Sequence, residues 1–473
     1  MPEHGYQAIR VAIEINVLPG VAGGIVQSTV GLVRSLGQLD GPERYLLIAE
    51  RNEQRDWIQP YCGANQQVRT RAELRRGASP WAQTNGQAHR NGSQPLSMRL
   101  RRALKPTVQM IRRVVGRLTP QSAWPSVPVS DGLYESLGCD VLHFPTQSFT
   151  LCALPTIYNP HDLQHLHYPQ FFSPVDLALR ETIYRTACEL ANTVVVGSEW
   201  IKQDVVRHYR LDPQKVQIIP WAPPTEFYPP LEPERLEQAR RRLSLPQTYM
   251  LYPAVTWPHK NHLRLLEAIA ELRDRRGMVV NLVCTGSKYP FHWPKIEQRV
   301  RELRLEPQVR FLGFVSEEDL RAVYRLAQFL ILPTLFEADS CPIHEAWKEG
   351  LAVASADITA LPDQVGDAGL LFDPRSVSAI ADAIARMSTD AELRRQLIER
   401  GHRRVRDFDW ERTARAYRAV YRRAAGLTLN DEDRWLLEWD WMRYPNRSPA
   451  SAAPQTERLS SNTSAALANI ANE

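Results

Sequence analysis

The chain has 473 residues, which is too long for a single hydrophobic core, so at least two domains are expected. Its 43% hydrophobic and 23% charged residues are typical of a globular protein, and no apolar run reaches the 18 residues of a membrane-spanning helix. The net charge of +5 comes from one stretch, Gln66 to Leu118, with twelve basic residues and one acid; the rest is net negative, which argues against a nucleic-acid-binding protein.

The cysteines indicate a reducing environment. All six are scattered singly without a Cys-x-x-Cys pair, which argues against a disulfide framework and against a zinc site. The N-terminal residues lead into a strand-like run without the pattern of a signal peptide. We therefore expect a cytoplasmic protein that carries no metal and no other cofactor.

The first predicted elements are a strand at Val11–Val17, a glycine loop and a helix. Gly23 and Gly24 end the loop and open the helix, in which apolar residues recur at helical spacing from Ile25 to Leu36. Glycines let a backbone approach a ligand, and a helix start offers amide groups to anions. The alternative is a plain turn.

Residues 52–130 are rich in Arg, Gln, Ser, Gly and Pro, which predicts an irregular insertion in the first domain. Basic and apolar residues interleave between Arg99 and Arg117, and Pro106 prevents one continuous helix there. Cationic amphipathic segments bind anionic membrane surfaces. Arg99–Arg117 is therefore either a membrane-docking segment, which would make the protein peripherally membrane-associated, or a disordered basic loop.

Strand-like and helical runs alternate over the rest of the chain, which predicts parallel sheets with crossover helices. The expected strands are Asp140–Phe144, Thr156–Tyr158, Thr193–Val196, Tyr249–Pro253, Val279–Cys284, Val309–Leu312, Phe329–Leu332, Ala352–Ser355 and Gly369–Phe372. The expected helices of the second half are His262–Arg275, Ile296–Leu303, Glu317–Leu326, Ile343–Glu349, Val377–Met387, Ala391–Arg406 and Trp410–Ala425.

Domain boundaries follow from composition. A proline-rich stretch from Pro220 to Pro230 reads as a linker. We predict a first domain at 1–222, a second at 223–407 and a separate helix at 408–427. Residues 445–473 are rich in Ser, Ala, Asn and Pro, and we expect them to be a disordered tail.

Two glutamates eight positions apart, Glu337 and Glu345, span a predicted loop-to-helix junction. Pro342 suits the first turn of that helix, and Asp339 or Ser340 could cap it. Free amides at the helix start would then lie between the carboxylates, which suits a diphosphate flanked by sugar hydroxyls. The alternative is a capped helix with two solvated glutamates.

This motif, followed by Gly350 and the strand 351–355, resembles the donor-site signature of retaining GT-B glycosyltransferases, in particular family 4. The resemblance runs from Gly23 to about Tyr421. It implies an α/β GT-B fold, with two Rossmann-like doubly wound domains facing a central cleft. It also implies that Glu337 contacts the donor sugar, that Glu345 contacts the ribose, and that the helix at 408–427 crosses back to the first domain.

Further roles follow from the same resemblance. His161, in Pro160-His161-Asp162, would face the donor sugar, whereas His165 and His167 are expected to be structural loop histidines. Lys260 would neutralise the donor diphosphate in place of a metal ion. The glycine loop would lie over the donor phosphates and the acceptor, and the loop at Gly286 would lie near the nucleotide.

The full predicted site is larger. Phe314 and Val315 would supply backbone contacts to the base. The predicted catalytic residues are His161 and Glu337. The predicted donor-binding residues are Gly23, Gly24, Lys260, Asn261, Gly286, Phe314, Val315, Ala338, Asp339, Ser340, Cys341 and Glu345.

Two features depart from the family pattern. Many relatives carry an arginine six residues before the lysine, where this chain has Ala254, so His259 or another base would have to compensate. The glutamate loop has Ala338-Asp339-Ser340 where Gly-Phe-Gly is commoner, which would alter the donor sugar preference.

The sequence therefore predicts a retaining glycosyltransferase that moves a hexose or deoxyhexose from a GDP- or UDP-linked donor to a carbohydrate or lipid-linked acceptor, in polysaccharide or glycolipid assembly. The alternatives are a catalytically silent nucleotide-sugar-binding scaffold and a nucleotide-sugar epimerase or hydrolase of the same fold. An NAD-dependent enzyme is disfavoured, because no Gly-x-Gly-x-x-Gly follows a strand.

Overall fold

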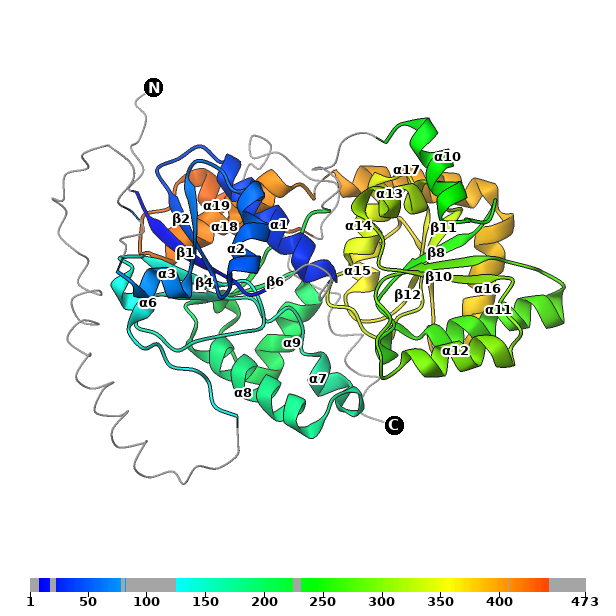
Figure 1. Ribbon diagram of the computed structural model, residues 1–473, viewed down its shortest axis with the longest axis horizontal. Helices are drawn as coiled ribbons and strands as arrows, with labels where there is room; N and C mark the ends of the chain where they lie inside the picture. Colours follow the sequence, from blue (N-terminus) through cyan, green and yellow to red (C-terminus); the bar gives the residue numbers. More distant parts are fainter. Residues whose placement is uncertain are drawn as a thin grey trace, which may run out of the picture.

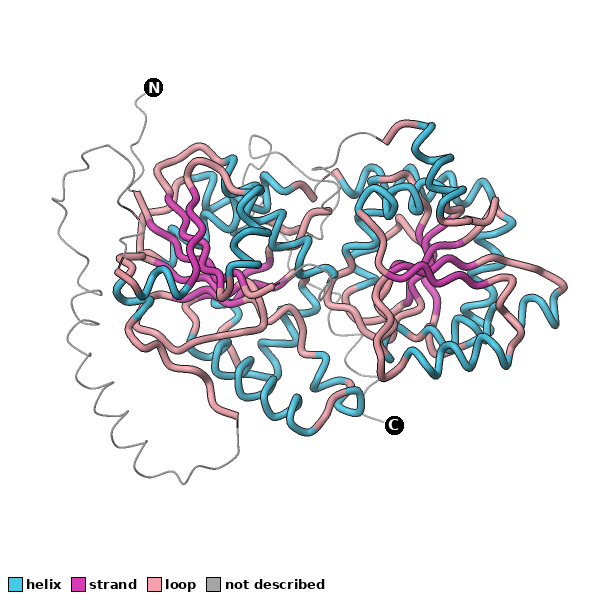
Figure 2. Tube along the Cα trace, in the orientation of Figure 1, coloured by secondary structure: helices cyan, strands magenta, loops and turns pink. Residues whose placement is uncertain are grey.

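The computed structural model describes residues 8–17, 23–77, 81, 125–223, 231–406 and 408–441. It shows two lobes side by side, each built around one parallel sheet with helices on both faces (Figures 1 and 2). The strand order is β3-β2-β1-β4-β5-β6-β7 in the first lobe and β10-β9-β8-β11-β12-β13 in the second. Both orders reverse beside the first strand of the lobe, which is the doubly wound Rossmann-like arrangement. The predicted α/β fold class is confirmed.

The first lobe combines elements from both ends of the chain. Its strands are β1 (Arg10–Ile15), β2 (Arg44–Ala49), β3 (Gln66–Thr70), β4 (Val141–Phe144), β5 (Thr156–Tyr158), β6 (Thr193–Val196) and β7 (Val216–Ile218). Its helices are α1 (Gly23–Gln38), α2 (Asn52–Ile58), α3 (Arg71–Arg75), α6 (Leu133–Ser136), α7 (Gln164–His167), α8 (Pro174–Leu190), α9 (Glu199–Tyr209), α18 (Trp410–Ala424) and α19 (Asp431–Glu438).

The second lobe is continuous in sequence. Its strands are β8 (Met250–Pro253), β9 (Leu282–Thr285), β10 (Val309–Gly313), β11 (Phe329–Leu332), β12 (Val353–Ala356) and β13 (Leu370–Phe372). Its helices are α10 (Pro233–Arg242), α11 (His262–Arg276), α12 (Trp293–Glu302), α13 (Glu317–Leu326), α14 (Cys341–Lys348), α15 (Leu361–Val365), α16 (Val377–Thr389) and α17 (Ala391–Val405). Short 3-10 turns are η1 (Gln59–Tyr61), η2 (Pro169–Phe171), η3 (Pro213–Lys215) and η5 (Pro258–Lys260).

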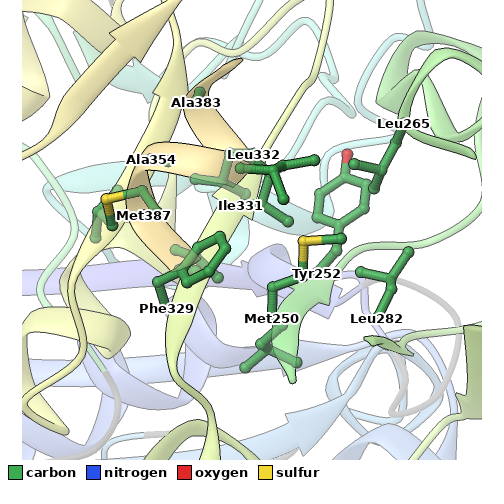
Figure 3. Packing of buried hydrophobic residues seen from close by; sticks show 14 of the residues in the cluster. Met250, Tyr252, Leu265, Leu282, Phe329, Ile331, Leu332, Ala354, Ala383 and Met387 are labelled. Atoms are coloured by element: carbon green, nitrogen blue, oxygen red, sulfur yellow. The ribbon is translucent and has the colours of Figure 1, made fainter. Parts of the chain in front are cut away.

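Helices cover both faces of each sheet, so central strands are buried on both sides and read as continuous apolar runs. In the second lobe every residue of Phe329–Leu332 is buried, and this strand packs with Met250, Leu265 and Met387 in one core (Figure 3). None of the described helices combines the length and the apolar composition needed to cross a membrane.

The prediction of irregular structure over 52–130 is wrong for its first part. α2, β3 and α3 follow one another there, and β3 pairs with β2 at the edge of the first sheet. β3 has no apolar run, and one of its buried residues is the polar Gln66. Burial of Gln66 is tolerated because its side-chain amide donates to the backbone oxygen of Val33 at 2.7 Å. β7, which was not among the expected strands, is the last strand of this sheet. Arg99–Arg117 and the tail at 445–473 lie outside the described residues.

α18 returns to the first lobe, while α16 and α17 belong to the second (Figure 1). Its tyrosines join a buried polar network. His143 Nδ1 lies 2.9 Å from the hydroxyl of Tyr421, and His143 Nε2 lies 2.7 Å from Asn159 Oδ1. The amide of Asn159 donates to the hydroxyl of Tyr417 at 2.7 Å. Because these groups satisfy one another, the helix is fixed on the sheet without unpaired polar atoms in the network.

The returning segment extends beyond the predicted limit of residue 427. α19 packs on α18, and Gln217 of β7 donates to the backbone oxygen of Leu437 at 2.8 Å. Arg422 makes buried ion pairs with Glu43 at 2.5 Å and with Asp433 at 3.0 Å. Removing one partner would leave a buried charge, so these pairs fix the position of both helices.

Candidate active site

A cleft of about 690 Å³ lies between the two lobes, a size common for small-ligand sites. Several of the residues that line it lie in the segments that follow strands of both sheets: Gly24 comes after β1, His161 after β5, Lys260 after β8 and Glu337 after β11. In each sheet the order reverses between the first strand and its neighbour, at β1/β4 and at β8/β11. Ligands of doubly wound sheets bind at that reversal, so the cleft lies where the topology favours binding.

Most of the predicted site residues meet in this cleft. Its lining includes Gly24, His161, Lys260, Gly286, Phe314, Val315, Glu337, Ala338, Asp339, Ser340, Cys341 and Glu345. Gly23 is the first residue of α1, next to Gly24. Asn261 is not among the lining residues, because its side-chain amide is buried and donates to the backbone oxygens of Pro333 and Pro374, both at 2.8 Å. Asn261 therefore joins strand ends instead of facing the cleft.

Lys260 and Glu337 form an ion pair across the reversal of the second sheet. Lys260 Nζ lies 2.5 Å from Glu337 Oε1, and the two side chains are 17% and 12% exposed. Thr359 holds the backbone of Glu337 by donating to its carbonyl oxygen at 2.6 Å and accepting from its N–H at 3.2 Å. The pair thus presents a cation and a carboxylate side by side at a fixed place in the cleft.

Helix α14 begins beside this pair. Cys341 is its first residue, Pro342 lies in its first turn, and the preceding Ser340 makes no side-chain capping bond. The first amides of α14 therefore lack a side-chain cap, which leaves a partial positive charge at the cleft. One turn on, the buried Glu345 accepts a 2.6 Å hydrogen bond from Tyr324, and burial raises the pKa of Glu345.

His161 lines the same cleft from the first lobe. Its Nε2 lies 2.8 Å from the backbone oxygen of Pro145, and since a carbonyl only accepts, Nε2 carries the proton. Burial lowers the pKa of His161, so the ring is neutral at pH 7 and its Nδ1 can accept a hydrogen bond from a hydroxyl. Trp221 stacks on this ring, with centroids 6.1 Å apart, and also lines the cleft. Trp221 was missed because it lies in the Pro-rich stretch predicted to be a linker.

Family models match both lobes. "Glycosyltransferase Family 4" matches residues 89–227 and "Glycosyl transferases group 1" matches residues 235–404. The chain is a family-4-like glycosyltransferase with the GT-B fold.

Individual relatives are distant. The glycosyltransferase is 27% identical over 267 residues to O-antigen chain mannosyltransferase B of Escherichia coli, covering 55% of this chain and 69% of that one. It is 28% identical over 281 residues to a D-inositol 3-phosphate glycosyltransferase of Corynebacterium glutamicum, covering 57% and 67%. Its structure resembles that of Anabaena HepE in complex with UDP and glucose, with a TM-score of 0.60, 15% identity and coverage of 87% and 99%.

Ala254 stands at the position where the family pattern has an arginine, and it lines the cleft against Gly286. A Cβ added to Gly286 would lie 2.7 Å from the carbonyl carbon of Ala254. His259 is buried, and burial lowers its pKa well below the usual value, so its neutral ring supplies no compensating charge. Among the described lining residues, the Lys and Arg side chains are Lys260 and Arg180. Lys260 is therefore the cation at the second-lobe wall.

The loop that departs from the family pattern touches the first lobe. Ser198 donates to the backbone oxygen of Ala338 at 2.8 Å, and a Cβ on Gly197 would lie 3.1 Å from Asp339 Oδ2. Asp339 Oδ2 is buried and has no hydrogen-bond partner among the described residues. Burial raises the pKa of Asp339 to about 7. Gly197 and Ser198, which follow β6 and were not among the predicted site residues, therefore hold the glutamate loop.

The residue before Glu337 is also held by the first lobe. Phe336 packs among His167, Tyr168 and Trp200, with ring centroids 5.4, 6.1 and 5.7 Å away. The hydroxyl of Tyr168 donates to the backbone oxygen of Leu335 at 2.9 Å. The position of the Glu337 loop therefore depends on contacts between the lobes.

Proposed function

We propose that this glycosyltransferase moves a hexose or deoxyhexose from a GDP- or UDP-linked sugar to an acceptor hydroxyl with retention of anomeric configuration, in polysaccharide or glycolipid assembly. The carrying observation is the 2.5 Å pair of Lys260 and Glu337 beside the uncapped start of α14. This arrangement joins a phosphate-binding cation to a carboxylate that accepts from sugar hydroxyls. The mannosyltransferase relative and the UDP and glucose in the Anabaena structure support the choice of substrate.

On the donor side, the ammonium group of Lys260 and the first amides of α14 would bind the diphosphate and stabilise the charge that develops as it leaves. Glu337 would then exchange its pairing with Lys260 for hydrogen bonds from the sugar. Glu345, held by Tyr324, would accept from the ribose hydroxyls. Phe314 is 70% exposed on the cleft wall and follows β10, which suits a contact with the base.

On the acceptor side, the start of α1 and His161 would position the attacking hydroxyl, with His161 Nδ1 accepting from a sugar hydroxyl. The acceptor oxygen would bond to the anomeric carbon on the face from which the phosphate leaves, and a leaving phosphate oxygen would take the acceptor proton. We assign the acceptor side to residues 1–222 with the helix at 408–427, and the donor side to 223–407.

A panel of nucleotide sugars (GDP-mannose, UDP-glucose, UDP-GlcNAc, UDP-galactose and deoxysugar donors) tests the proposal by thermal shift and nucleotide release. We expect one donor to raise the melting temperature of the wild type. We expect the Glu337→Gln variant to lose the release of nucleotide from that donor. Glu392→Gln, at an exposed glutamate of α17, is the matched control. Stabilisation by a donor without transfer to any acceptor would indicate a silent scaffold. A changed or free sugar formed without acceptor would indicate an epimerase or hydrolase, and no shift with any donor would contradict donor binding.

A further inference from the structure

Outside the cleft, three side chains of the first lobe converge on one point. His167 ends α7, while Asp204 and His208 lie one turn apart in α9. His167 Nε2 lies 2.9 Å from both carboxylate oxygens of Asp204, and His208 Nδ1 lies 3.1 Å from Asp204 Oδ1. None of the three is among the residues that line the cleft. The donor-site chemistry therefore leaves this cluster unexplained.

The donor set suits a transition metal of the zinc class. Imidazole nitrogen and carboxylate oxygen are ordinary zinc ligands, and three protein ligands with water in the fourth position make an open tetrahedral site. One ligand atom from each residue can be chosen so that all lie within 4.8 Å of one another. Zinc bonds of about 2.0–2.2 Å place tetrahedral ligand atoms roughly 3.4 Å apart. The two spacings to Asp204, 2.9 and 3.1 Å, would widen by a few tenths of an ångström, and the two histidine ligand atoms, which lie within 4.8 Å of each other, would adjust toward the same separation.

The exposure and the arrangement of the three side chains also suit a metal site. The side chains of His167 and His208 are 28% and 33% exposed, so an ion can enter from solvent, whereas Asp204 is 6% exposed and held between them. A single histidine would suffice to pair a carboxylate, but here two converge on it from separate helices. His208 Nδ1 also lies 3.0 Å from the backbone oxygen of Asp204, a bond whose proton a metal would displace.

We propose that His167, Asp204 and His208 bind a divalent ion of the zinc class at the junction of α7 and α9. The ion would also act on the donor loop. The His167 ring lies 5.4 Å from both Phe336 and Trp200, and Phe336 directly precedes Glu337. A metal that fixes the His167 ring would fix the surface on which Phe336 packs, and would strengthen the contact between the lobes.

The test uses the full chain, freed of metal with a chelator and titrated with zinc chloride alone by calorimetry, with cobalt chloride as a spectroscopic probe. We expect one zinc ion per chain, proton release on binding, and the intense visible absorption of four-coordinate cobalt. His208→Gln should weaken zinc binding by about 10-fold or more. His402→Gln, at an exposed histidine of α17, should leave it unchanged.

Two further measurements keep the test decisive. Zinc should raise the melting temperature of the wild type and not that of His208→Gln, because binding to the folded state alone stabilises it. Where His208→Gln melts lower than the wild type without metal, His167→Asn replaces it as the test variant. No zinc binding by the wild type, or equal binding by wild type and ligand variants, would overturn the proposal.

Discussion

The two lobes share a strand order but offer different chemistry to the cleft. The second lobe contributes charge: Lys260 and Glu337 pair at the sheet reversal, and Glu345 follows in α14. At the corresponding reversal, the first lobe contributes the glycine start of α1, and the neutral His161 stacked on Trp221 lies nearby. The comparison teaches that topology fixes where a ligand binds, while the loops after the strands decide what is bound.

The largest expected effect comes from removing the cation that the second lobe contributes to the cleft. Lys260→Ala should lower sugar transfer about 10²–10³-fold, because it removes a preorganised cation from the developing diphosphate charge. Lys288→Ala is the control, since Lys288 lies over the ring of Trp293 and is not a lining residue. Steady-state turnover with the donor found in the panel measures both. Wild-type turnover in Lys260→Ala would mean that the charge of the second lobe is not used.

A second variant tests how tightly the second-lobe wall is built. Gly286 has φ +105° and lies against the backbone of Ala254, whereas Gly277 has φ +64° and open space around it. Gly286→Ala should cost about 3 kcal/mol from strain and overlap, and Gly277→Ala about 1 kcal/mol from strain alone. Chemical denaturation of both variants gives the difference. Equal losses would show that the close approach to Ala254 relaxes easily.

A third pair of variants probes the polar network that holds α18 on the first lobe. Tyr417→Phe leaves the amide of Asn159 without its partner and should lower the free energy of unfolding by about 1–2 kcal/mol. Tyr45 is also buried, but its hydroxyl has no partner among the described residues. Tyr45→Phe should therefore change stability by less than about 0.5 kcal/mol. Similar losses from the two substitutions would argue that the polar network does not fix α18.

A further prediction concerns how stability changes with pH at the contact between the lobes. The pKa of Asp339 is raised to about 7 in the folded protein, above its ordinary value near 4, so the folded state holds a proton that the unfolded state loses. The stability from this group is present at acid pH and is lost as pH rises from about 4 through 7. Asp339→Asn should remove that loss, so the variant should gain on the wild type between pH 5 and pH 8. If the denaturation midpoints of Asp339→Asn and the wild type differ by the same amount at pH 5 and at pH 8, this prediction is contradicted.

Periodicity predicted most of the second lobe. In the first lobe it predicted β5 and β6 with their observed bounds but missed β2, α2, β3 and α3. Phe329–Leu332 and Glu317–Leu326 have the predicted bounds, because one is a continuous buried run and the other an amphipathic helix. β3 escaped prediction because an edge strand carrying a hydrogen-bonded, buried Gln66 shows no apolar pattern. β9 begins at Leu282, three residues after the predicted Val279, which is exposed.

The cleft residues were predictable where they follow strands, because strand ends meet at one edge of a parallel sheet. The tertiary contacts of the cleft residues were not predictable from the sequence. Gly197 and Ser198 touch the glutamate loop only where the two lobes meet, and Trp221 reaches His161 only through the packing of the first lobe. No spacing in the sequence encodes either contact. The spacing of Asp204 and His208 places them on one face of α9, but His167 joins them only through the packing of α7.

The return of α18 sets an order of assembly during synthesis. Trp410, Tyr417 and Tyr421 belong to the same hydrophobic cluster as Val11 and Ile13 of β1, so the part of this sheet face that α1 does not cover stays exposed until the last described helices have left the ribosome. The second lobe, contained within 231–406, has all its strands before that point. We therefore expect the second lobe to fold first on the nascent chain, although chains generally fold from the N-terminus, and a chain truncated before Trp410 to retain a folded second lobe beside an exposed first sheet.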